Sequence, residues 1–118
     1  MPTPRILVID DAATVRMYHR KILGDAGWLT DEAINGVEAL ERVHSQDAGD
    51  AFDLYVVDIN MPRMDGYALA AFIREAEQER GLPRIPIVAC TANALPSATA
   101  KCLAAGMDDY LVKPMQLG

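Results

Sequence analysis

Four short apolar runs of the chain each end in polar side chains that could take part in chemistry. In chain order they are Ile6–Ile9 before Asp10 and Asp11, Leu54–Val57 before Asp58, Ile87–Cys90 before Thr91, and Tyr110–Val112 before Lys113 and Pro114. If these runs are neighbouring parallel strands, their carboxyl ends meet at one edge of a sheet. Three carboxylates, a hydroxyl and an ammonium group would then converge there.

Clustered carboxylates favour a bound cation, because ionised groups repel one another when they lie close together. Asp10, Asp11 and Asp58 would form such a cluster. Mg²⁺ prefers a few carboxylate oxygens together with water and phosphate oxygens. We therefore predict a site for Mg²⁺, or Mn²⁺, at these three residues.

A divalent cation on one side of Asp58 and the Lys113 ammonium on the other would suit phosphoryl transfer, in which negative charge must be stabilised during in-line attack. Carboxylates serve as covalent phosphoryl acceptors in proteins. Asp58 follows the central run and would be the acceptor, while the Thr91 hydroxyl could donate a hydrogen bond to a phosphoryl oxygen.

These groups are positioned by an alternation of apolar runs with stretches of helical period, which is typical of βα units around a parallel sheet. Residues 28–33 supply a weaker, edge-like strand. We predict an α/β, flavodoxin-like, doubly wound sheet of five parallel strands in the order 2-1-3-4-5. This order makes the Asp10–Asp11 pair a neighbour of Asp58.

Four helices are predicted between the strands, each with an apolar stripe. Gly27, Gly81 and Gly106 should end the first, third and fourth, and Asn35 with Glu38 forms a relaxed capping box for the second. The stripes are Val15, Tyr18, Ile22 and Ala26 in the helix at 13–26; Val37, Leu40 and Val43; Leu69, Ala70, Ile73 and Ala76; and Leu95, Ala98, Cys102 and Ala105.

Only four residues follow Pro114, which is too short for another amphipathic helix. We therefore expect the last helix to be absent or truncated and the natural chain to continue beyond Gly118. Apolar surface near the first and fifth strands should then be exposed.

Length and composition agree with one compact domain over residues 1–118, with 51% hydrophobic residues. The net charge of −6 and the scattered basic residues argue against direct nucleic-acid binding. The sequence holds no apolar stretch long enough to span a membrane, and its start does not read as a signal sequence, so the cytoplasm is the expected location. Cys90 and Cys102 are expected as buried thiols, and His19 and His44 as surface residues.

The motifs resemble those of response regulator receiver domains, of the kind found in chemotaxis proteins and hybrid sensor kinases. They are Ile9-Asp10-Asp11, the stretch from Val57 to Gly66 (VDINMPRMDG), Thr91-Ala92-Asn93-Ala94, and the stretch from Gly106 to Pro114 (GMDDYLVKP). The resemblance covers essentially the whole chain, and four ordered motifs make it specific.

This resemblance implies that Asp58 accepts a phosphoryl group from a histidine kinase or a histidine phosphotransfer domain, and that the domain then acts on a downstream effector or output domain. It also implies that the backbone carbonyl of Asn60 joins the metal ligands, with Asp11 bound directly and Asp10 through water. Thr91 and Tyr110 would move together on activation. Lys113 would form an ion pair with the phosphoryl group, and the peptide bond between Lys113 and Pro114 would be cis.

Asn60 lies two residues after the proposed acceptor Asp58, and Asn93 lies two residues after Thr91. In receivers, the side chains at these two positions influence how fast the aspartyl phosphate is hydrolysed. Neither is a strong base, so we predict intermediate rather than very fast loss of the phosphoryl group. The domain would be a signalling module that catalyses only its own phosphorylation and dephosphorylation.

Other readings are less favoured. A Mg²⁺-dependent aspartyl-phosphate phosphatase or phosphotransferase of the haloacid dehalogenase type needs a second Asp two residues after its nucleophile, where this chain has Asn60, or Ala12 after Asp10. An FMN binder would have its phosphate repelled by Asp10 and Asp11. A pseudo-receiver would not be expected to keep the acidic residues and Lys113.

Each of these residues also has a purely structural alternative. Asp10 or Asp11 could cap the first helix, Asp58 could begin a turn, and Thr91 could simply end a strand.

The context of the domain stays open between two arrangements. The region from Thr91 to Tyr110 looks most like receivers attached to hybrid sensor kinases, whereas the start of the chain looks more like a stand-alone or N-terminal receiver.

Overall fold

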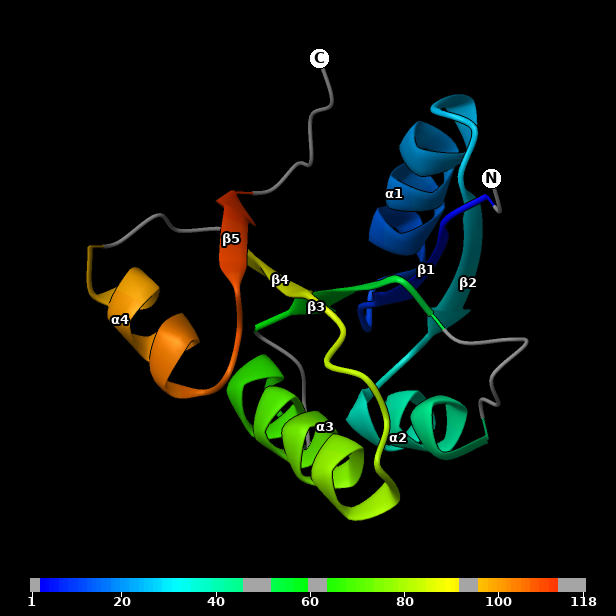
Figure 1. The fold of residues 1–118 in the computed structure, drawn as a ribbon. Coiled ribbons are helices and arrows are strands. Elements are labelled where there is room, and N and C mark those ends of the chain that lie inside the picture. The colour runs from blue at the N-terminus through cyan, green and yellow to red at the C-terminus, as the bar shows by residue number, and fades with distance from the viewer. Residues whose placement is uncertain (1–2, 46–51, 60–63, 92–95, 113–118) are drawn as a thin grey trace.

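One parallel sheet organises the protein (Figure 1). The computed structural model describes residues 3–45, 52–59, 64–91 and 96–112, the last range without the side chains of 96–99 and 112. The strand order is β2-β1-β3-β4-β5, which confirms the predicted flavodoxin-like topology. The strands are β1 (Arg5–Ile9), β2 (Leu29–Ala33), β3 (Leu54–Asp58), β4 (Ile87–Thr91) and β5 (Asp109–Val112).

The difference between central and edge strands follows from what covers them. Leu7 and Val8 in β1, like Val56 and Val57 in β3, are buried because both faces of the central strands are covered. The edge strand β2 instead carries the polar run from Thr30 to Glu32. The apolar runs in the sequence therefore identified the centre of the sheet, and the mixed run identified its edge.

The helices form two layers, and Figure 1 shows α1 apart from α2, α3 and α4. One core cluster joins one face of the sheet to Val43, Ile73 and Cys102, which come from α2, α3 and α4. The other cluster joins Ile6 and Val8 to Leu23 of α1. The helices are α1 (Ala13–Asp25), α2 (Gly36–Ser45), α3 (Gly66–Arg80) and α4 (Pro96–Ala104).

The predicted helix ends are confirmed. The three glycines expected to follow helices all have positive φ, at 90°, 65° and 97° for Gly27, Gly81 and Gly106. At the start of α2, Glu38 N donates to Asn35 Oδ1 at 2.8 Å, and Ile34 N donates to Glu38 Oε1 at 3.2 Å. The carboxylate thus reaches the residue before the cap, which makes the capping box a relaxed one.

The prediction for the buried face of α1 was wrong by one residue. The buried residues are Arg16, His19 and Leu23, whereas Tyr18 of the predicted stripe is 44% exposed. His19, expected at the surface, is buried, while His44 is exposed as expected. A shift of one residue turns a helix by about 100°. The polar contacts of Arg16 favour this orientation, and a search for apolar stripes does not detect them.

The predicted apolar stripes of the other helices agree better with the observed burial. In α3, Leu69, Ala70, Ile73 and Ala76 are all buried as predicted, but in α2 Val37 is 50% exposed and Ala39 takes its place in the core. In α4 Cys102 is buried as predicted, and the side chains of Leu95 and Ala98 lie outside the described part of the chain.

The expected open apolar surface beside β1 and β5 is not seen among the described residues. Ile6 and Val8 are buried, and Leu111 is partly buried and packs against the same cluster. Trp28 and Leu23 cover this face of β1. The prediction of a missing last helix concerns residues 113–118, which lie outside the described residues. No described helix is long and apolar enough to cross a membrane.

Candidate acidic site at the carboxyl ends of the strands

The register of β1 and β3 places Asp10 and Asp58 at the same level of the sheet. Ile9 pairs with Val57, and each aspartate is the next residue of its strand or strand end. One carboxylate oxygen from each of Asp10, Asp11 and Asp58 lies within 4.8 Å of the others. The predicted acidic cluster is therefore present, with Asp10 and Asp58 only 2% and 3% exposed and Asp11 open to solvent.

Asp10 shapes the turn from β1 into α1. Its backbone N donates to Ala33 O at 3.2 Å, which extends the pairing with β2 by one bond. Its Oδ1 accepts from Ala12 N at 2.9 Å. Ala12 is the N-cap of α1, and no side chain caps that helix. The alternative in which Asp10 or Asp11 serves as the helix cap is therefore not supported.

Arg16 contacts the backbone beside the acidic cluster, and the sequence analysis did not identify it as part of this region. Its Nη1 donates to the backbone oxygen of Asp10 at 2.8 Å, and its Nε lies 3.3 Å from Glu32 Oε1. The side chain is 10% exposed, so a buried cation supports the strand end that carries the acidic pair. No apolar pattern marks this position, because the stripe predicted for the helix at 13–26 runs through Val15 and Tyr18, one residue before Arg16 and His19.

Glu32 on β2 balances the charge of α1. It accepts from Arg20 as well as from Arg16. The hydrogen bond from Arg20 lowers the pKa of Glu32, and the bond and charge of Arg16 add to this effect, so that together they outweigh the opposing desolvation. The helix that follows Asp10 and Asp11 is thus tied to the edge strand by ion pairs.

Asp58 is supported from the other side by the start of α3. Gly66 N donates to Ile59 O at 3.0 Å, and Asp65 caps the helix by accepting from Ala68 N at 2.8 Å. A Cβ on Gly66 would come within 2.7 Å of Asp58 O. The helix therefore begins in direct contact with the backbone of the candidate acceptor.

Thr91 and Tyr110 come from the two strands beyond β3. Asp58 pairs with Cys90, so Thr91 lies one residue further along β4, where it is buried. Tyr110 pairs with Ala89 and packs, partly buried, against the large core cluster. The sheet thus brings both predicted switch residues to the same side of Asp58. Lys113, Asn60 and Asn93 lie outside the described residues.

Cys102 on α4 and Tyr67 on α3 are joined by a side-chain hydrogen bond, which links the two helices. Burial raises the pKa of the Cys102 thiol, and although the hydrogen bond with Tyr67 opposes this effect, the net shift is upward. Burial likewise raises the pKa of Tyr67, with contributions from Cys102 and Asp65. A thiol with a raised pKa is a weak nucleophile. Cys90 is also buried, and neither residue forms a disulfide within the described chain, as predicted.

The donor set of the acidic cluster fits a hard divalent cation. It offers three carboxylate oxygens, two of them from buried residues, and leaves one side open at the exposed Asp11. Mg²⁺ is usually bound through a few carboxylates and retains waters or binds phosphate oxygens at its other positions. The site can therefore hold a cation and bring an anionic phosphate compound next to Asp58.

Comparison with curated proteins finds relatives among hybrid histidine kinases. The chain is 38% identical over 112 residues to hybrid signal transduction histidine kinase L of Dictyostelium discoideum, and 38% identical over 112 residues to the sensor histidine kinase GacS of Pseudomonas protegens. Both alignments cover 95% of this chain, but only 6% and 12% of the respective relatives. The chain thus spans a small part of the length of these proteins.

Solved structures share the fold. The chemotaxis protein CheY4 of Vibrio cholerae matches with a TM-score of 0.85 and 29% identity, covering 98% of this chain and 90% of that one. A second match is the structure of the Ssk1 receiver domain with the histidine phosphotransfer protein Ypd1 of Saccharomyces cerevisiae. Its TM-score is 0.87 and its identity 25%, and the match covers 98% of this chain and 81% of that one.

A family model described as the response regulator receiver domain matches residues 6–118, nearly the whole chain. The match includes β1 from Ile6 onward, the other four strands, and the three carboxylates that meet at the strand ends. The chain therefore belongs to the response regulator receiver domain family.

Proposed function

We propose that this receiver accepts a phosphoryl group on Asp58 from a phosphohistidine, with Mg²⁺ bound beside the acceptor, and that the resulting change of conformation controls a partner or output domain. The observation that carries the proposal is the convergence of Asp10, Asp11 and Asp58, whose carboxylate oxygens lie within 4.8 Å of one another. Three like charges at one strand edge are costly without a cation.

Each group of the site has a separate role in this proposal. Asp11 would hold the cation directly and Asp10 through water, and the Asn60 carbonyl would complete the protein ligands. A cation held there would supply positive charge against the phosphoryl oxygens. A carboxylate oxygen of Asp58 would attack the phosphorus atom of the phosphohistidine. The phosphorus–nitrogen bond would break and the donor's imidazole would leave, while Lys113 and the Thr91 hydroxyl would bind the oxygens of the transferred group.

Thr91 and Tyr110 transmit the event in this proposal. A phosphoryl group on Asp58 would favour the arrangement in which the Thr91 hydroxyl contacts it, and Tyr110 on the next strand would follow. Such a response is a shift between existing conformations, driven by the added contacts. The two residues lie on the paired strands β4 and β5, where Tyr110 pairs with Ala89 and Thr91 with Val112, and this neighbourhood of the strands supports the role.

Relatives support the class of partner. The two curated relatives compared above are a hybrid signal transduction histidine kinase and a sensor histidine kinase, and the Ssk1 receiver was crystallised with a histidine phosphotransfer protein. A histidine kinase or a histidine phosphotransfer domain is therefore the proposed donor. The haloacid dehalogenase-like alternative is not favoured, because the family model that matches the chain is that of a receiver.

Incubation with acetyl phosphate and Mg²⁺, followed by intact mass measurement, tests the proposal. We expect the addition of one phosphoryl group to the natural sequence and none to Asp58→Asn. Asp53→Asn is a matched control, since Asp53 precedes the other end of β3 and accepts from Arg5 N. Phosphorylation of Asp58→Asn to the level of the control would overturn the assignment of the acceptor.

The lifetime of the modified protein tests the roles of Asn60 and Asn93. Because neither side chain is a strong base, we expect intermediate stability of the phosphoryl group. Removing acetyl phosphate and following the mass over time measures the decay. A half-life of seconds would contradict this part of the proposal.

A further inference from the structure

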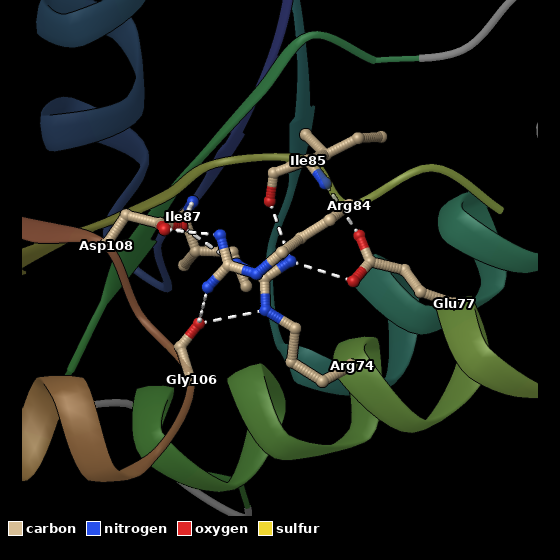
Figure 2. A network of polar contacts seen from close by, with 7 residues as sticks. All are labelled: Arg74, Glu77, Arg84, Ile85, Ile87, Gly106 and Asp108. Atoms are coloured by element: carbon tan, nitrogen blue, oxygen red, sulfur yellow. Dashed lines mark hydrogen bonds and ion pairs between the residues drawn. The ribbon is translucent and has the colours of Figure 1, made fainter.

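Arg74 on α3 is the centre of a polar network far from the acidic cluster (Figure 2). Its side chain is 15% exposed and donates four hydrogen bonds. Nε donates to Gly106 O at 2.9 Å, Nη1 to Glu77 Oε1 and Ile85 O at 2.8 Å each, and Nη2 to Asp108 Oδ2 at 2.9 Å. One planar guanidinium thus joins α3 to the chain before β4 and to the turn before β5.

The two carboxylates in the network extend its reach. Glu77 Oε2 accepts from Ile85 N at 2.9 Å, and Asp108 Oδ2 accepts from Ile87 N at 2.9 Å. Asp108 N also donates to Ile87 O at 2.9 Å. The carboxylates that bind Arg74 therefore hold the backbone at the beginning of β4, and Asp108 fixes the start of β5 to it.

The turn before β5 is shaped around the Arg74 side chain. Gly106 has a φ of +97°, and a Cβ at this position would lie 2.9 Å from Arg74 Cγ. Glycine is needed for this conformation and for the close approach of the aliphatic stem. Arg74 therefore contacts the turn with its stem as well as with its guanidinium.

The other end of α3 touches the candidate acceptor. Gly66, eight positions before Arg74, packs on the backbone of Asp58. At a rise of about 1.5 Å per residue, the two contacts are about 12 Å apart along one continuous helix. The same helix thus contacts Asp58 at its start and holds the beginning of β5 through Arg74.

We propose that Arg74 is a positioning residue, which sets the placement of β5, with Tyr110, relative to Asp58. The inference rests on the proposed function. Arg74 does not touch the reacting groups. Its fork fixes the turn that starts β5, and small displacements of groups around a reacting centre have large effects on rate.

Arg74→Lys tests this inference, because lysine keeps the charge but cannot reproduce the planar fork of donors. We expect the initial rate of phosphorylation by acetyl phosphate and Mg²⁺ to fall roughly tenfold. Arg80→Lys is the matched control on the same helix, since Arg80 is exposed and donates to the backbone oxygen of His44. It should keep the rate within about twofold.

A spectroscopic readout separates positioning from stability. The chain has four tyrosines, so fluorine NMR of protein labelled with 3-fluorotyrosine reports Tyr110 directly once its signal is assigned with Tyr110→Phe. We expect Arg74→Lys to move or broaden the Tyr110 signal before any phosphorylation and to leave the signal of exposed Tyr18 unchanged.

The outcomes decide the inference in each case. A folded Arg74→Lys protein with a lower melting temperature but with the rate and Tyr110 signal of the natural sequence would show a structural role only and overturn it. If Arg74→Lys does not fold, Asp108→Asn is compared with Arg84→Lys, because Arg84 also forms an ion pair with Asp108. A Tyr110 signal displaced by Asp108→Asn but not by Arg84→Lys supports the inference, and equal displacement or none overturns it. If the natural sequence is not phosphorylated, the proposed function fails, whereas the Tyr110 comparison still decides whether Arg74 places β5.

Discussion

Gly66 packs against the backbone of Asp58 with no room for a side chain between them. A Cβ at position 66 would lie 2.7 Å from Asp58 O and 2.9 Å from Ile59 Cα, and both of these atoms belong to the backbone. The residue that begins α3 is therefore constrained by the residue that we propose as the phosphoryl acceptor.

Gly66→Ala should consequently impair both stability and phosphorylation. We expect a loss of about 1–3 kcal/mol in the free energy of unfolding, because backbone atoms must shift to admit the methyl group. Phosphorylation by acetyl phosphate should slow as the Asp58 backbone moves. Urea unfolding and intact mass measure the two effects.

Gly24→Ala provides the control for this substitution. Gly24 lies in α1 and a Cβ there would meet nothing within 4 Å. Because alanine has the higher helix propensity, the change should be neutral or stabilise by up to about 1 kcal/mol. Equal losses for the two variants would contradict the steric argument.

Asp11→Asn should change how the protein responds to Mg²⁺. Without the ion, removal of one negative charge from the cluster relieves repulsion, so the melting temperature should stay equal or rise. With the ion, a ligand is missing and the stabilisation by binding should be smaller. Thermal unfolding across a Mg²⁺ titration measures both.

Asp53→Asn should show the same Mg²⁺ response as the natural sequence, since Asp53 lies at the opposite end of β3. An unchanged response of Asp11→Asn would argue that Asp11 does not bind the ion.

Ile73 and Phe72 are neighbours in α3 with opposite environments. Ile73 is fully buried, whereas Phe72 is 46% exposed. Ile73→Ala should cost about 2–5 kcal/mol in the free energy of unfolding, through lost burial and a cavity. Phe72→Ala should cost clearly less. Chemical denaturation of both variants checks the orientation of α3, and a reversed order would show that the helix is turned differently.

Glu32 should make stability depend on pH in the acid range. Its folded pKa is lowered by Arg20 and Arg16, so its contribution is complete above the unfolded value of about 4.3 and is lost as pH falls through the lower folded value. Glu32→Gln should therefore lower stability at neutral pH and give a flatter acid limb. Urea midpoints between neutral and acidic pH measure this.

Arg20→Gln should flatten the same limb in part, because it removes the first cause of the shift. If the acid limbs of both variants match that of the natural sequence, the ion pairs between α1 and β2 do not contribute to stability in solution.

The sequence by itself determined the order of the sheet and the residues at its carboxyl edge. Continuous apolar runs such as that ending at Val57 can be buried on both faces, and the rules for parallel connections then leave few arrangements. The strand order alone therefore places Asp10 and Asp11 beside Asp58. Helix ends at glycines such as Gly81 were equally readable, because a positive φ has a local cause.

Only the tertiary structure decided which faces and partners surround that edge. Arg16 is buried in α1 because it finds polar partners in Glu32 on β2, sixteen residues away, and in the backbone oxygen of Asp10 at the end of β1. The network around Arg74 has the same origin, since its acceptors lie on three separate segments. Local periodicity records where apolar atoms recur along one helix. Long-range packing determines which charged side chains can be buried with a partner, and this decides how each helix is turned toward the sheet.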